Sequence, residues 1–146
     1  MSFAFTADDM NSLSQDQKAA IVGACMATVM ADGQIDQAEV AKFDAEFKKI
    51  PWGVPQATVE EMIKLIYAKL QTVRSPAEAQ EFMQRTAATL PSMDIKEKAV
   101  ALAAKVAYVN GTMNANTKNV LNALAIAMQI SLPRMAEIAA EVKSQA

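Results

Sequence analysis

The chain lacks histidine entirely and contains only one cysteine, four glycines and five prolines among its 146 residues. Without histidine it cannot form a Ser-His-Asp or Cys-His triad, an HExxH zinc site or a histidine acid–base pair. It also lacks the glycine motifs of dinucleotide-binding folds and P-loops, so no phosphate-cradling loop is expected. Cys25 lies in an apolar run and has no disulfide partner, which predicts a buried hydrophobe in a reducing compartment. These gaps exclude histidine-dependent catalysis and the common phosphate-binding loops.

Excess positive charge and long apolar runs are equally absent. Lysines and arginines number 14 against 16 acids, which gives a net charge of −2 and a sequence pI of about 5.2. This balance argues against electrostatic binding of nucleic acid or anionic lipid. The N-terminus has neither the basic region nor the long apolar core of a signal peptide, and no apolar run reaches the roughly 18 residues that span a bilayer. We therefore expect a cytoplasmic protein without a membrane span.

What the sequence does have is a helix-forming composition. Apolar residues make up 52% of the chain, and the abundant Ala, Leu, Met, Glu, Gln and Lys all favour helices. The ten methionines are dispersed at helical spacing, so we interpret them as core residues rather than as soft-metal ligands. Alternating β-branched and aromatic runs, which indicate strands, are missing. We predict an all-α fold: one domain covering residues 1–146, with about seven helices in a bundle.

Capping signals and proline breaks place the expected helices. The clearest start is Ser75-Pro76-Ala77-Glu78, which has a serine N-cap, a proline at the first helical position and a glutamate at the third. Two other helix starts are ambiguous. One helix begins at either Pro55 or Thr58, and another begins at either Ser92 or Asp94. The expected helices span residues 14–30, 36–50, 55 or 58 to about 70, 75–90, 92 or 94 to about 110, 114–130 and 131–142, with an eighth if residues 6–13 form a turn.

One glycine-centred segment occurs twice. The first copy contains Asp32, Gly33, Asp36 and Glu39, and the second, 78 residues later, contains Asn110, Gly111, Asn114 and Thr117. Each copy predicts a buried helix, a tight turn at glycine and a second amphipathic helix. We predict that residues 16–50 superpose on 94–128 and that both glycines have positive φ. The chain then divides into repeat 1 (about 16–50), an insert (56–90), repeat 2 (about 94–130) and a C-terminal helix (132–143).

The three acids of the first copy, Asp32, Asp36 and Glu39, are the candidate functional residues. Their spacing around Gly33 matches the second half of a calcium-binding loop, but the first half fails because its first and third positions would be Thr28 and Met30, inside the apolar helix. Capping explains two of the acids, since Asp36 caps the following helix and Glu39 closes its capping box. Asp32 is different, because a carboxylate at the negative end of a helix needs a cation or a lysine from another helix. Metal binding and capping both remain open, and nothing indicates acid catalysis by Asp32 and Asp36.

An apolar helix that ends in ADG-x-I-x-x-x-E, with a second such unit further on, resembles the tellurite-resistance TerB family. It is similar also to the TerB-like domain of some membrane-anchored DnaJ-type co-chaperones. The resemblance implies an all-α fold of about seven helices, no enzymatic activity and a role in bacterial stress response. It also implies that acidic loop residues bind a divalent metal, and these fall on Asp32, Asp36 and Glu39.

The second loop departs from the family pattern. Asn110, Asn114 and Thr117 stand where the first loop has acids, so the charge is lost although asparagine keeps a carbonyl oxygen. We therefore expect a non-enzymatic TerB-like stress-response module that binds one divalent cation, calcium or magnesium, at the first loop and has no other cofactor. The alternative is a helical protein-interaction scaffold that has lost metal binding. In both cases the expected partner is a protein rather than nucleic acid.

Overall fold

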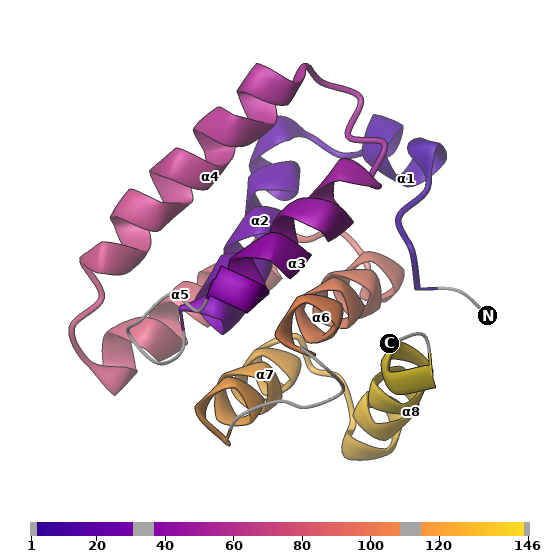
Figure 1. Ribbon diagram of the computed structural model, residues 1–146. Coiled ribbons are helices and arrows are strands. Elements are labelled where there is room, and N and C mark those ends of the chain that lie inside the picture. Colours follow the sequence, from indigo (N-terminus) through magenta and orange to yellow (C-terminus); the bar gives the residue numbers. More distant parts are fainter. Residues whose placement is uncertain (1–2, 31–36, 109–114, 145–146) are drawn as a thin grey trace.

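The computed structural model describes residues 3–30, 37–108 and 115–144, apart from the side chain of Glu39 (Figure 1). Every regular element in these ranges is an α-helix, which confirms the predicted fold class. The helices are α1 (Ala7–Ser12), α2 (Gln15–Val29), α3 (Gln37–Lys48), α4 (Gln56–Gln71), α5 (Pro76–Thr89), α6 (Met93–Ala107), α7 (Ala115–Ala127) and α8 (Leu132–Ser144). Within the described ranges, no helix combines the length and apolar character that crossing a membrane requires.

Serine side chains begin helices where the sequence predicted them. The Ser14 hydroxyl accepts a hydrogen bond from the backbone N–H of Gln17, and the Gln17 side chain accepts one from the backbone N–H of Ser14. Ser75 accepts from the backbone N–H of Glu78, and Pro76 occupies the first position of α5. Each serine thus satisfies a backbone donor that has no partner within its helix.

The structure selects between the alternative helix starts. α6 begins after Ser92 rather than at Asp94, because the Ser92 hydroxyl accepts a hydrogen bond from the backbone N–H of Ile95. α4 begins directly after Pro55, which is the N-cap and supplies no side-chain hydrogen bond. The start at Thr58 is therefore wrong, and Pro55 stands one position before the first helical residue.

The helices α6 and α7 each end about three residues earlier than the sequence predicted. α6 ends at Ala107, and Tyr108 after it has an extended backbone with φ −80° and ψ 105°. α7 ends at Ala127 because Gln129 has a positive φ of 61°. This left-handed residue lets the N–H of Ile130 reach the carbonyl oxygen of Ala125 at 3.0 Å, the pattern of a Schellman motif.

The helices α2 and α6 form the centre of the bundle. Residues 20–26 of α2 and 99–104 of α6 are all buried, so the middle of each helix is covered on every side. Such helices need neighbours all round. The helices α4, α5 and α7 pack against α2, while α3, α7 and α8 pack against α6.

The helix bounds repeat the 78-residue offset of the sequence pattern. The helices α2 and α6 each have 15 residues and a serine N-cap, Ser14 and Ser92, and α3 and α7 start 78 residues apart. The packing also pairs the halves, since α3 contacts α6 and α7 contacts α2, while α4 covers α2 and α8 covers α6. Superposition of the two units stays a prediction, and Gly33 and Gly111 lie outside the described residues.

Candidate functional site

The predicted metal ligands lie in the connection between α2 and α3 and in the first turn of α3. Because α2 ends at Val29 and α3 begins at Gln37, Asp32 and Asp36 fall in the connecting segment, outside the described residues. Glu39 lies in the first turn of α3, and its side chain is also outside the description. The ligand set Asp32, Asp36 and Glu39 therefore stays a prediction.

In the second loop, the structure describes one of the three residues that correspond to the acids of the first loop. Thr117 lies in the first turn of α7 and is 1% exposed, whereas Asn110 and Asn114 lie outside the described residues. A neutral side chain thus packs inside the bundle at the position that corresponds to Glu39. A neutral threonine can be buried at this position at less cost than a charged carboxylate.

The C-terminal end of α2 offers no positive charge to the acidic segment that follows it. The last turn of α2 contains no lysine or arginine. The backbone N–H of the C-cap residue, Met30, donates to the carbonyl oxygen of Met26 at 2.9 Å and so ends the helix in a regular way. In the ranges 3–30, 37–108 and 115–144, no three Cys, Asp or Glu side chains are grouped so that they could hold a metal ion.

A hollow of about 550 Å³ lies next to Met30, the last described residue before the acidic segment. It is enclosed by α2, α4, α5, α7 and the connection between α4 and α5, and we call it the α4/α5 hollow. Its lining residues are Ala27, Met30, Leu70, Gln71, Val73, Arg74, Ala79, Phe82, Met83 and Val120. Among these side chains Arg74 alone is charged. A volume of this size falls in the range of roughly 300–1,000 Å³ that is typical of small-molecule sites.

A second hollow of about 640 Å³ lies between α5 and α7, and we call it the α5/α7 groove. Ala79, Met83 and Val120 line both hollows, so the two are adjacent. Ile126 lines the groove on α7 and is 69% exposed. Neither hollow could be predicted from the sequence, because their walls come from segments that are far apart in the chain.

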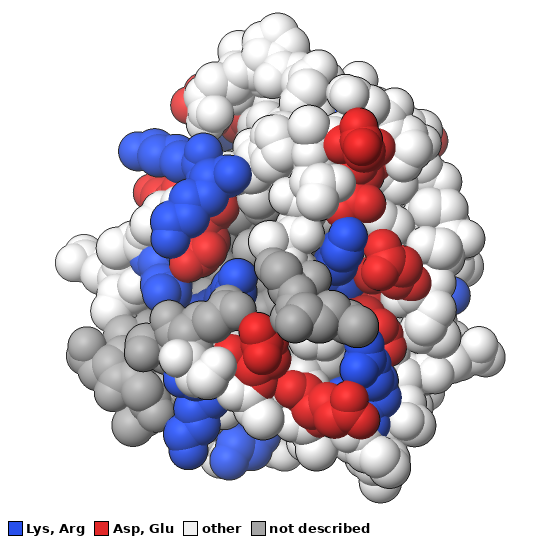
Figure 2. All heavy atoms as spheres, turned by 90° about the vertical axis from the view of Figure 1, so that its right-hand side faces the viewer, with Lys and Arg blue, Asp and Glu red and all other residues white. Residues whose placement is uncertain are grey.

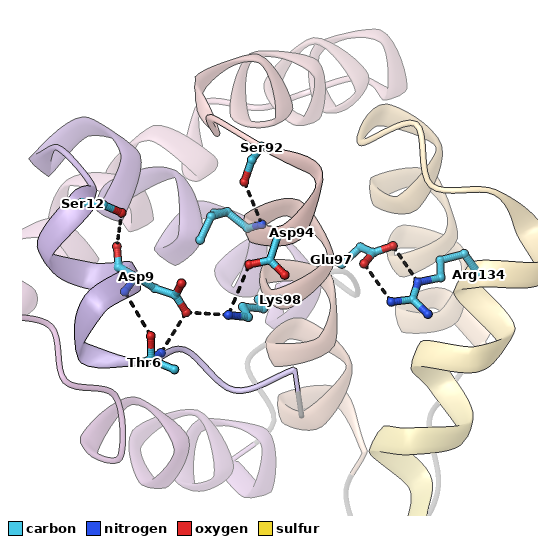
Figure 3. Close-up of polar contacts among 9 residues, drawn as sticks. Thr6, Asp9, Ser12, Ser92, Asp94, Glu97, Lys98 and Arg134 are labelled. Carbon is cyan, nitrogen blue, oxygen red and sulfur yellow. Dashed lines mark hydrogen bonds and ion pairs between the residues drawn. The ribbon is translucent and has the colours of Figure 1, made fainter. Parts of the chain in front are cut away.

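Two clusters of ion pairs tie neighbouring helices to α6 (Figure 3). In the first, Lys98 Nζ lies 2.6 Å from Asp9 Oδ2 on α1 and 3.3 Å from Asp94 Oδ2. Burial by itself lowers the pKa of Lys98, but its hydrogen bonds to the two carboxylates raise that pKa above its ordinary value. Burial by itself raises the pKa of Asp9, but hydrogen bonds from Lys98 and Thr6 outweigh this and lower it overall.

Arg134 on α8 forms the second cluster. Its guanidinium donates to both carboxylate oxygens of Glu97, at 2.7 and 3.0 Å, and to Glu137 at 2.9 Å. These hydrogen bonds raise the pKa of Arg134, and the guanidinium also lies 5.1 Å from the ring centroid of Phe3. Acidic and basic side chains are interspersed on this face of the molecule (Figure 2). The charges in both clusters have protein partners, so these clusters hold helices together.

Cys25 lies at the centre of α2 and is fully buried, as its apolar run predicted. Burial raises the pKa of its thiol because the thiolate loses its hydration. The side chain therefore fills the core and is not a reactive nucleophile.

The described helices define an all-α protein in which an acidic segment joins two helices of the bundle. The family model of Tellurite resistance protein TerB matches residues 18–140. The chain therefore belongs to the TerB family, as the resemblance in its sequence indicated. No curated protein and no solved structure matches the chain.

Proposed function

We propose that the protein is a non-catalytic module of the TerB type, which acts in a stress response of the tellurite-resistance kind and binds one divalent cation. The ligands in this proposal are Asp32, Asp36 and Glu39. The observation that carries the proposal is the family match, because residues 18–140 include both glycine-centred loops and the helices on either side of them.

The chemistry of the first loop supports a hard cation. Calcium and magnesium prefer oxygen ligands, and the loop brings three carboxylates within eight residues. The positive N-terminal end of a helix favours carboxylates, so the presence of Asp36 and Glu39 at the start of α3 can be explained without a bound cation. Asp32, in contrast, follows the negative end of α2, whose last turn has no basic residue. A bound cation would remove this unfavourable interaction.

The second loop supports one site per chain rather than two. Its corresponding residues are Asn110, Asn114 and Thr117, which have no charge. Thr117 is 1% exposed within the bundle. Because divalent affinity depends on the number of charged ligands, we assign the cation to the first loop alone.

A second candidate function is a helical protein-interaction scaffold that has lost metal binding. The observation that favours it is the α5/α7 groove, where Ile126 is 69% exposed beside a hollow of about 640 Å³. Exposed apolar surface of this kind often receives the apolar face of a partner helix. The cation experiment below separates this function from the first.

Thermal unfolding with and without divalent cations tests the proposal. A cation that binds only the folded chain must raise the melting temperature by mass action, so millimolar calcium, magnesium or manganese should stabilise the wild type. Asp32→Asn, which copies the second loop, should lose this increment. Asp44→Asn is the matched control, because Asp44 is an exposed acid on α3. Absence of a shift in the wild type for all three ions would leave the scaffold function.

Two variants at Asp36 separate capping from ligation. Serine keeps a side-chain oxygen for the cap, so Asp36→Ser should preserve the metal-free stability and lose the cation-dependent increment. Alanine removes the cap as well, so Asp36→Ala should cost about 1 kcal/mol without metal. If Asp36→Ser keeps the full cation response, Asp36 is a cap and not a ligand.

A further inference from the structure

We infer that the α4/α5 hollow binds a single-chain amphiphile with an anionic head group, of the class of free medium-chain fatty carboxylates. The inference concerns residues other than Asp32, Asp36 and Glu39 and does not depend on the proposed function. It rests on three features of the described residues: an open hollow of suitable size lined mainly by apolar side chains, two small residues that leave room in it, and an exposed arginine at its edge that forms no ion pair with a described residue.

The walls of the hollow suit an alkyl chain. Leu70 and Val73 come from the end of α4 and the connection after it, Phe82 and Met83 from α5, and Val120 from α7. These side chains enclose about 550 Å³. Methionine is unbranched and flexible, so Met83 can adapt to chains of different shape. Burial of methylene groups against such a surface is favourable by the hydrophobic effect.

Two small side chains leave room for the ligand. Ala27 lines the hollow from α2 and Ala79 lines it from α5, and both are half-buried. A larger apolar residue at either position would extend into the space. These alanines therefore give a direct way to close the hollow without introducing charge.

Arg74 gives the hollow its preference for an anion. The chain has three arginines, of which Arg85 pairs with Glu81 and Arg134 pairs with Glu97. Arg74 forms no ion pair with any residue in the described ranges. A guanidinium can donate two parallel hydrogen bonds to one carboxylate, which makes a carboxylate head group the natural complement.

The described lining of the hollow agrees with this charge preference. No acidic side chain is among its described lining residues, and Gln71 supplies a neutral polar group next to Arg74. On the other side of Phe82, Lys69 Nζ lies 5.9 Å from the centroid of the ring. Because Glu78 and Glu81 line the smaller hollow that contains Lys69 and Phe82, the preference for an anion comes from Arg74 itself.

Titration with decanoate below its micellar concentration tests the inference, with isothermal calorimetry as the readout and a metal-free buffer to avoid calcium soaps. The wild type should bind decanoate, and Arg74→Gln should weaken binding about tenfold or more because it removes a charge-assisted contact. Lys64→Gln is the matched control, since Lys64 is an exposed cation on α4 outside the hollow. Decyltrimethylammonium, which has the same tail and the opposite charge, should bind more weakly than decanoate.

A second set of variants locates the ligand. Ala79→Leu and Ala27→Leu should each abolish decanoate binding, and circular dichroism would show which of them keeps the helical fold. In the wild type, the methyl resonances of Met30 and Met83 should shift on titration, while that of Met135, buried on α8, should not.

Three results would overturn the inference. The first is no decanoate binding by the wild type. The second is equal affinity in the wild type and Arg74→Gln, and the third is full binding by a folded leucine variant. Each result leaves the cation proposal unaffected, because that proposal concerns Asp32, Asp36 and Glu39.

Discussion

Replacing Asp9 by asparagine tests how the first helix is held on the bundle. The helix α1 has six residues, which is too short to be stable alone. The Asp9 carboxylate lies 2.6 Å from Lys98 Nζ, and the two side chains are only 17% and 12% exposed. Asparagine keeps an oxygen that can accept from the backbone N–H of Thr6, as the carboxylate does at 2.9 Å. The substitution therefore removes mainly the charge that faces Lys98.

The magnitude follows from the burial of the pair. A hydrogen bond to a charged group contributes about 1.5–3 kcal/mol, whereas an exposed ion pair contributes about 0–1 kcal/mol. Lys98 keeps a second partner in Asp94, but that side chain is 70% exposed and can compensate only weakly. We expect Asp9→Asn to lower the free energy of unfolding by about 1–2 kcal/mol, or the melting temperature by about 3–6 °C. Asp8→Asn, an exposed acid in the same turn, is the control and should change it by less than about 0.5 kcal/mol.

The effect of Asp9 should depend on pH in one direction. Its pKa in the folded protein lies below the ordinary value, so the charged carboxylate stabilises the fold above the pKa of the unfolded chain. That contribution is lost as the pH falls through the folded-state pKa, so the difference between wild type and Asp9→Asn should shrink below about pH 4. Urea unfolding can be followed by the fluorescence of Trp52, the single tryptophan, which is 5% exposed. Equal effects of Asp8→Asn and Asp9→Asn, or a difference that persists in acid, would refute the role of this ion pair.

Three further substitutions test the local structure by the same urea assay. Gly53→Ala should destabilise the fold by about 1–2 kcal/mol, because Gly53 has a φ of +74° and a Cβ there would lie 3.3 Å from Asn11 Oδ1; an unchanged midpoint would contradict the strain at this turn. Ser75→Ala should cost about 1 kcal/mol through loss of the N-cap of α5, and Ser75→Asp, which keeps an acceptor, should restore most of it. Leu124→Ala should cost about 2–5 kcal/mol because Leu124 is 1% exposed in the core, and a cost well below 1 kcal/mol would mean that α7 packs more loosely than described.

The helix starts could be predicted because their signals are local. Ser14 and Ser75 each act on a backbone N–H three residues later, so the sequence pattern contains the whole interaction. Helix ends were less predictable, because they depend on contacts beyond the pattern. The left-handed Gln129 ends α7 without the glycine that usually marks such a position. The start of α4 was ambiguous for a similar reason, since Pro55 provides no capping side chain.

The candidate sites also differ in whether their residues are close in the sequence or are brought together only by folding. The acids Asp32, Asp36 and Glu39 could be selected from the sequence because they are close in the chain and interrupt two apolar segments. The α4/α5 hollow could not, because Ala27 and Val120 meet only when α2 and α7 pack together. The lack of an acidic partner for Arg74 among the described residues is likewise a property of the folded chain. Charge composition alone cannot show which cations are already paired.

Manganese binding, measured by electron paramagnetic resonance in a titration of the metal-free protein, tests the central claim most directly. The spectrum of free manganese falls when the ion is bound, so the titration counts the sites on each chain. We predict one site in the wild type and in the control Asp44→Asn, and none at the same concentrations in Asp32→Asn. No bound manganese in the wild type, or undiminished binding in Asp32→Asn, would contradict the assignment of a divalent cation to the first loop.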